Sequence, residues 1–118
     1  MHHFKNLRVW GGGIEFCKEI YQITKKFPKR EQMGITRQLR EAALEITGNI
    51  SRGTLSKKYF PQYLKRAAKS ARDCETIIIV CEELGFLNKK SFEQLSARLE
   101  GIERMLNSLI KKVEETSK

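Results

Sequence analysis

The spacing of apolar residues predicts four helical segments and no strand. Apolar positions recur every three or four residues over 9–26, 35–52, 57–84 and 89–114, the period of a helix with one buried face. The third segment keeps this spacing without a gap, through Phe60, Leu64, Ala67, Ala71, Cys74, Ile78 and Cys81. The β-branched run 77–80 lies inside the same period, which outweighs its local preference for a strand.

Local signals mark where these helices begin and end. Gly53 stops the second segment, and Gly85 ends the third in the left-handed conformation that glycine adopts readily. Ser56 and Asn88 are suited to cap the amino ends of the third and fourth segments. Because the connections are short, neighbouring helices are expected to run antiparallel. We therefore expect one all-α domain over residues 1–118, an antiparallel up-down-up-down four-helix bundle.

Three consecutive glycines conflict with the first helix. Gly11, Gly12 and Gly13 follow Trp10 directly, and each glycine costs about 1 kcal/mol relative to alanine inside a helix. Either the helix begins after Gly13, or the packing of Trp10 supports a weakened first turn. A phosphate-binding loop is excluded, because no strand precedes the glycines and no Gly-Lys-Ser/Thr follows them.

The composition argues against a membrane or exported protein. The chain has 118 residues, with 23 Lys and Arg against 14 Asp and Glu, a net charge of +9. Its longest apolar run, 77–81, is far too short to cross a bilayer, and the first residues lack a signal peptide. We expect a cytoplasmic location.

The residues for catalysis or metal binding are missing from the expected places. The only histidines are His2 and His3, so no interior histidine is available as a general base or as part of a paired Glu-x-x-His metal site. Cys74 and Cys81 would lie about 10 Å apart along a helix, too far for a disulfide or a shared zinc ion. We expect the cysteines to be buried thiols, and we expect no catalytic residues, no metal, no cofactor and no small-molecule substrate.

Charge is distributed unevenly along the third segment and the turn before it. Between residues 52 and 72 no carboxylate occurs, whereas the next residues, 73–83, contain only acidic charges. The cations of the first block are Arg52, Lys57, Lys58, Lys65, Arg66, Lys69 and Arg72. The acids of the second block are Asp73, Glu75, Glu82 and Glu83.

The basic block suggests a phosphate-binding surface. Four of its cations are separated by seven, four and three residues, which places them on one helical face over about 20 Å. Such a face could follow a nucleic-acid backbone without reading its sequence. The candidate nucleic-acid-binding residues are Lys58, Lys65, Arg66, Lys69 and Arg72, supported by Arg37, Arg40 and Arg52. Tyr59 and Tyr63 could stack on unpaired bases. The alternative is a solvated face that keeps a small protein soluble.

A second interpretation assigns the charge to assembly. The basic block of one subunit could contact the acidic block of another, or an acidic protein partner. The candidate subunit-interface residues are Trp10, Phe60, Tyr63, Asp73 and Glu75. The apolar members would supply buried area at such a contact, and the acidic members would supply charge pairing.

Several ordered motifs resemble the 23S rRNA-intervening-sequence protein family of bacterial four-helix bundles. They are Phe4-Lys5-Asn6-Leu7-Arg8-Val9-Trp10, the run 34–43 beginning Gly-Ile-Thr-Arg-Gln, Asn49-Ile50-Ser51-Arg52-Gly53, and Leu84-Gly85-Phe86-Leu87. Arg52 stands where the family pattern has Glu, and the three glycines stand where it is helix-forming. The resemblance implies a homopentamer, an origin linked to inserts in ribosomal RNA genes, RNA rather than DNA as a partner, and no enzymatic activity.

Overall fold

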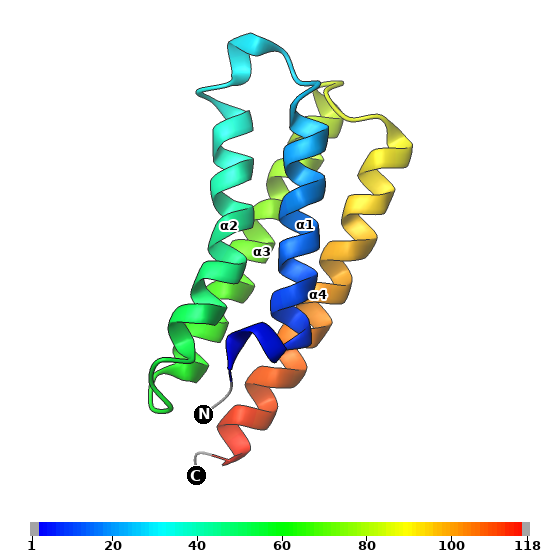
Figure 1. The fold of residues 1–118 in the computed structure, drawn as a ribbon. Coiled ribbons are helices and arrows are strands. Elements are labelled where there is room, and N and C mark those ends of the chain that lie inside the picture. Colours follow the sequence, from blue (N-terminus) through cyan, green and yellow to red (C-terminus); the bar gives the residue numbers. More distant parts are fainter. Residues whose placement is uncertain (1–2, 117–118) are drawn as a thin grey trace.

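The protein folds as a bundle of four long helices. The computed structural model describes residues 3–116, and His2 lies outside them. Its elements are η1 (Phe4–Asn6), α1 (Arg8–Thr24), η2 (Lys29–Glu31), α2 (Ile35–Gly53), α3 (Phe60–Glu83) and α4 (Lys89–Thr116). No strand occurs in this range. The helices alternate in direction (Figure 1), and the molecule is elongated, with extents of 48 × 23 × 20 Å. The predicted four-helix bundle is confirmed.

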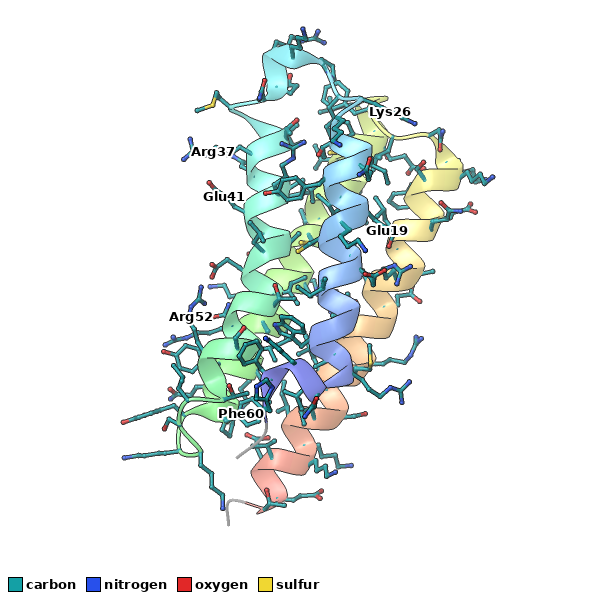
Figure 2. The ribbon with its side chains drawn as sticks, viewed as in Figure 1. Glu19, Lys26, Arg37, Glu41, Arg52 and Phe60 are labelled. Carbon is teal, nitrogen blue, oxygen red and sulfur yellow. The ribbon has the colours of Figure 1, made fainter. Side chains whose placement is uncertain are left out.

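The core runs the length of the bundle between the four helices (Figure 2). Every member of the apolar stripe predicted for α3, from Phe60 to Cys81, is buried. Phe16 and Ile20 from α1, with Leu99 and Leu106 from α4, are fully enclosed as well. α2 packs most extensively on α3, and α1 touches both α2 and α4. α3 thus buries the face that its 3.6-residue period marked.

The turn between α3 and α4 follows the sequence signals. Gly85 has a φ of 82°, the left-handed conformation expected of a helix-ending glycine. The N–H of Phe86 donates to the carbonyl of Cys81 at 2.9 Å, which closes the end of α3. Asn88 accepts a hydrogen bond from the N–H of Ser91 at 2.8 Å, so it caps α4 as predicted.

The predicted start of α3 near residue 57 is wrong. The helix begins at Phe60, preceded by Tyr59, and Ser56 lies in the connecting turn without capping α3. Pro61 explains the difference. Proline has no N–H and fits the first helical turn, whereas a start at residue 57 would require its missing hydrogen bond. α1 ends two residues earlier than predicted, at Thr24, and α4 continues two residues further, to Thr116.

The three glycines lie inside α1, and two of them, Gly12 and Gly13, are where other helices come close. A side-chain carbon on Gly13 would meet Thr47 Cγ2 of α2 at 2.4 Å, and one on Gly12 would meet Met105 Cε of α4 at 3.3 Å. Gly11 faces open space. Of the two alternatives, the helix that continues through the glycines is the observed one.

The three cysteines are buried free thiols, as predicted. Burial raises the pKa of Cys74 to about 12 and the pKa of Cys81 to about 11, and it also raises the pKa of Cys17. Thiol reagents attack the thiolate, so raised pKa values and burial both slow the reaction.

We expect a thiol reagent at pH 8 to label Cys74 and Cys81 at least about a hundredfold more slowly in the native than in the denatured protein, because their raised pKa values reduce the thiolate fraction by that factor or more. Cys17 is buried too and should also react more slowly in the native protein. Absorbance of the released reagent measures both rates. The guanidinium-unfolded protein is the control and should release three equivalents, one for each cysteine. Rapid native labelling of any cysteine would contradict the packing.

Candidate nucleic-acid interface

One end of the bundle gathers basic residues from four separate segments. In an antiparallel bundle, η1 with the first turn of α1, the last turn of α2 with the connection after it, the first half of α3 and the last turns of α4 meet at the same end (Figure 1). We call the cations of these segments the basic end. Its members are Lys5, Arg8, Arg52, Lys57, Lys58, Lys65, Arg66, Lys69, Lys111 and Lys112.

Few carboxylates accompany these cations. Residues 3–10 and 46–72 contain no Asp or Glu, and the last turns of α4 contribute Glu114 and Glu115. The acidic block of α3, which begins at Asp73, lies toward the opposite end of the same helix. The bundle is therefore strongly positive at one end, and a polyanion approaching that end meets the excess charge first.

Three predicted binding residues point into solvent at the basic end. Lys58, Arg66 and Lys69 are all exposed. The Lys58 ammonium lies 5.4 Å from the centroid of the Tyr59 ring, and the Arg66 guanidinium lies 4.8 Å from that of Tyr63. Lys69 forms no ion pair with any residue in the described range. These cations are available to an incoming phosphate group.

Lys65 and Arg72 are less available than the carboxylate-free sequence suggested, because α4 brings acids against them. Lys65 Nζ pairs with Glu114 Oε2 at 2.8 Å. Arg72 pairs with Glu75 at 2.9 Å and approaches Glu103 at 3.9 Å. Burial raises the pKa of Glu103, and the Glu75 charge raises it further, whereas Arg72 lowers it. These exposed pairs contribute little to stability, so a phosphate could compete for the cations.

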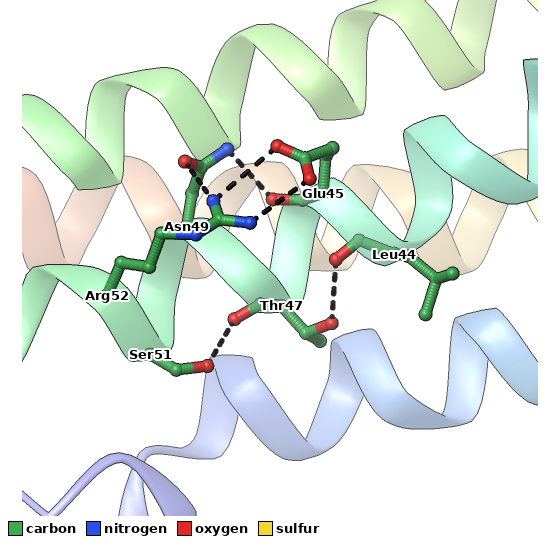
Figure 3. A network of polar contacts seen from close by, with 6 residues as sticks. All are labelled: Leu44, Glu45, Thr47, Asn49, Ser51 and Arg52. Carbon is green, nitrogen blue, oxygen red and sulfur yellow. Dashed lines mark hydrogen bonds and ion pairs between the residues drawn. The ribbon is translucent and has the colours of Figure 1, made fainter.

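Arg52 is held by a polar network on α2 (Figure 3). Its guanidinium donates to Glu45 Oε1 at 3.1 Å and to Asn49 Oδ1 at 2.8 Å. The buried Asn49 amide donates in turn to the Glu45 carbonyl at 2.9 Å. The hydroxyl groups of Ser51 and Thr47 donate further hydrogen bonds to backbone carbonyls of the same helix. The charge of Arg52 is thus largely compensated within α2.

The structure does not bring Arg37 and Arg40 to the basic end. Both lie in the first turns of α2, about 20 Å along the helix from Arg52. Arg37 pairs with Glu41 at 2.8 Å (Figure 2). Arg40 is half-buried against α1. The expectation that these two would extend the basic face overlooked the opposite directions of α2 and α3.

The residues predicted to lie at a subunit interface differ in how far their side chains are exposed to solvent. Phe60 is buried in the core, so it offers no surface to a second subunit, and this part of the prediction is corrected. Trp10 is half-buried and packs edge-on against Phe4 at 5.3 Å, and Tyr63 is half-buried beneath Arg66. Asp73 is exposed. Glu75 is half-buried and already paired with Arg72.

Sequence reasoning missed the cations that come from the chain ends. Lys5 and Arg8 precede the core of α1, and Lys111 and Lys112 belong to the last turns of α4. Within its own segment, each pair of cations is too small a cluster to indicate a binding surface. Combining the predicted antiparallel order with the position of each cation along its helix would have identified them, because the even-numbered helices end where the odd-numbered ones begin.

The helices and the basic end together define the class of this protein: a small four-helix bundle with its positive charge concentrated at one end. A family model described as 23S rRNA-intervening sequence protein matches residues 5–108, and the chain belongs to that family. A solved structure with the same fold is a protein of unknown function from the S23 ribosomal protein family of Bacteroides thetaiotaomicron VPI-5482, with a TM-score of 0.80 and 21% identity. The match covers 87% of this chain and 95% of the other.

A comparison with curated proteins finds no match. None of the helices within residues 3–116 combines the length and apolar character that crossing a membrane requires.

Proposed function

We propose that this protein is a non-enzymatic, oligomeric nucleic-acid-binding protein whose basic end contacts phosphate backbones without reading sequence. The observation that carries the proposal is the collection of cations from η1, α2, α3 and α4 at one end of the bundle, with few acids among them. RNA is the preferred partner because of the family to which the chain belongs.

The type of contact follows from the side chains at this end. Lysines predominate, and lysine acts on phosphate as a point charge on a flexible stem, which suits a backbone of variable conformation. Tyr59 is 47% exposed beside Lys58 and could stack on an unpaired base. The sequence of the basic end contains no base-reading motif, so affinity should depend on charge and strandedness rather than on sequence.

Oligomerisation is supported by apolar side chains exposed on the acidic half of α3 and on the residue that follows it. Leu84, Ile79 and Val80 are 58%, 46% and 41% exposed. Burial of such side chains against a second copy would remove apolar area from water. The family resemblance favours a homopentamer. A ring of copies would present several basic ends to one nucleic acid, and linked weak contacts would then add to a higher overall affinity.

The proposal is tested by titrating labelled RNA and DNA of unrelated sequences with the full chain and following fluorescence anisotropy. We expect binding at low salt, similar constants across sequences, and a logarithm of the affinity that falls linearly with the logarithm of salt concentration. The slope reports how many phosphates are neutralised. Absence of binding to every RNA and DNA at low salt would overturn the proposal.

A scaffold or protein-interaction role is the second candidate, and the exposed Leu84, Ile79 and Val80 favour it. Here the acidic half of α3 would meet a basic partner or a second copy, with Asp73 and Glu83 as exposed charges. This candidate expects no nucleic-acid binding at low salt, so the same titration separates the two functions.

A further inference from the structure

A small polar cavity lies at the end of the bundle opposite the basic end, where α1 passes through η2 into α2. Its volume is about 230 Å³, below the roughly 300–1,000 Å³ typical of sites for drug-sized ligands. Neither Asp nor Glu lines it. Its polar lining residues are Thr24, Lys25, Lys29, Gln32, Thr36 and Arg40. The size and charge fit a small anion.

The buried hydroxyl of Thr36 is the observation that points to a ligand in this cavity. The residue is 4% exposed and lines the cavity, yet its hydroxyl oxygen is buried with no hydrogen-bond partner. Buried polar atoms in native proteins nearly always have a partner, and each exception calls for an explanation. An oxyanion in the cavity would accept the hydrogen bond that this hydroxyl does not otherwise make.

Arg40 is held in a position to receive the same anion. Its Nε donates to Thr24 Oγ1 at 2.8 Å, and its guanidinium carbon lies 4.5 Å from the centroid of the Tyr21 ring. These contacts fix the plane of the guanidinium while its two Nη groups keep no protein acceptor in the described range. A guanidinium with two free parallel donors matches the geometry of a phosphate or carboxylate.

The amino end of α2 adds to the positive field of the cavity. Gly34 precedes α2 and supplies no side-chain cap to the first N–H groups of the helix, which carry a partial positive charge. Lys25 and Lys29 add full charges at the wall. Glu31 does not line the cavity, but its Oε1 lies 3.3 Å from the Cβ position of Gly34, so its charge, paired with Arg30 at 3.9 Å, offsets part of this field. An anion here would meet donors and cations without a competing carboxylate in the wall.

We propose that this cavity is a site for a dianionic phosphate group, either free or as a phosphate monoester. Thr36, Arg40 and the amino end of α2 would donate hydrogen bonds to its oxygens, with Lys25 and Lys29 providing further charge. The site is separate from the basic end and its proposal does not depend on nucleic-acid binding there. Phosphate is favoured over a carboxylate because its oxygens can accept from more donors at once.

Isothermal titration calorimetry of the full chain with inorganic phosphate, at constant ionic strength, tests the site. We expect saturable binding with one phosphate per chain, and about a tenfold loss of affinity in each of Thr36→Val and Arg40→Gln, the effect of losing one hydrogen bond to a charged group. Lys26→Gln is the matched control, because Lys26 is an exposed cation at the same end (Figure 2) that does not line the cavity. Its affinity should be unchanged.

The melting temperature of Thr36→Val without ligand separates ligand binding from a purely structural role of Thr36. A structural role would lower this melting temperature. Because the Thr36 hydroxyl has no partner, Thr36→Val should melt no lower than the parent protein.

Titrations with adenosine 5′-monophosphate and adenosine distinguish a phosphate monoester from free phosphate as the ligand. Binding of the monophosphate but not of adenosine assigns a monoester site, and binding of inorganic phosphate alone assigns a free-phosphate site. Absence of phosphate binding, an equal loss in Lys26→Gln, or a lower melting temperature of Thr36→Val would overturn the proposal.

Discussion

Replacing Lys57, Lys58 and Lys69 together by glutamate is expected to lower the affinity for RNA or DNA about a hundredfold or more near 0.1 M salt. All three lysines are exposed at the basic end, and none forms an ion pair with a described residue. Each phosphate that is no longer neutralised removes about 0.9 from the salt slope on a duplex and about 0.7 on a single strand. Fluorescence anisotropy over a salt series measures both the affinity and the slope.

A matched triple variant separates local charge from net charge. Lys26→Glu, Lys89→Glu and Lys90→Glu change the net charge by the same amount at the opposite end of the bundle, again at exposed lysines. If the basic end makes the contacts, this control should keep most of the affinity and nearly the full salt slope. Equal losses in the two triple variants would mean that only the total charge matters, and the proposed interface would then be wrong.

The fold could be predicted from the sequence because the period of apolar residues reports which face of each helix is buried. For α3, the whole stripe from Phe60 to Cys81 is buried as the spacing predicted. Turn residues were equally informative where a single conformation was required, as for Gly85 with its positive φ. The start of α3 was predicted too early because Ser56 suited an amino-terminal cap, whereas the missing N–H of Pro61 fits a start at Phe60.

The candidate site could be predicted only in part, because charge pairing depends on neighbours that are distant in sequence. Lys65 and Glu114 are 49 residues apart, so the block 52–72 seemed free of acids until α4 was placed beside it. Thr36 and Arg40 gave no signal of a cavity, since an unpartnered hydroxyl is visible only once the packing around it is known. The side-chain types were readable from the sequence, whereas their partners were not.

The glycines of α1 show the same limit. Their cost to the helix was evident from the sequence, but the compensating gain was not, because it lies in the close approach of α2 to Gly13 and of α4 to Gly12. A glycine that permits two helices to approach stabilises the bundle through the contacts made on either side of it. Close helix-helix contacts therefore explain the glycines at positions 12 and 13, whereas nothing in the structure explains Gly11.

Gly13→Ala is expected to destabilise the protein by about 1–3 kcal/mol, although alanine is the better helix former. The new methyl group would lie 2.4 Å from Thr47 Cγ2, a distance that requires the Thr47 side chain or the two helices to shift, and overpacking of this kind costs about that much. Gly11→Ala is the control, because nothing lies within 4 Å of that position. It should gain up to about 1 kcal/mol from helix propensity. Urea denaturation followed by circular dichroism measures both.

Thr47→Ser should rescue Gly13→Ala if the clash is the cause. Serine removes Cγ2 and keeps the hydroxyl, which donates to the Leu44 carbonyl at 3.1 Å. The double variant is therefore expected to be more stable than the sum of the two single effects, with a coupling of at least about 1 kcal/mol. Thr47→Ser alone loses a buried methyl group and should be slightly destabilised. If Gly13→Ala proved as stable as Gly11→Ala, or if the two substitutions were additive, α1 and α2 would not be in the close contact on which this packing depends.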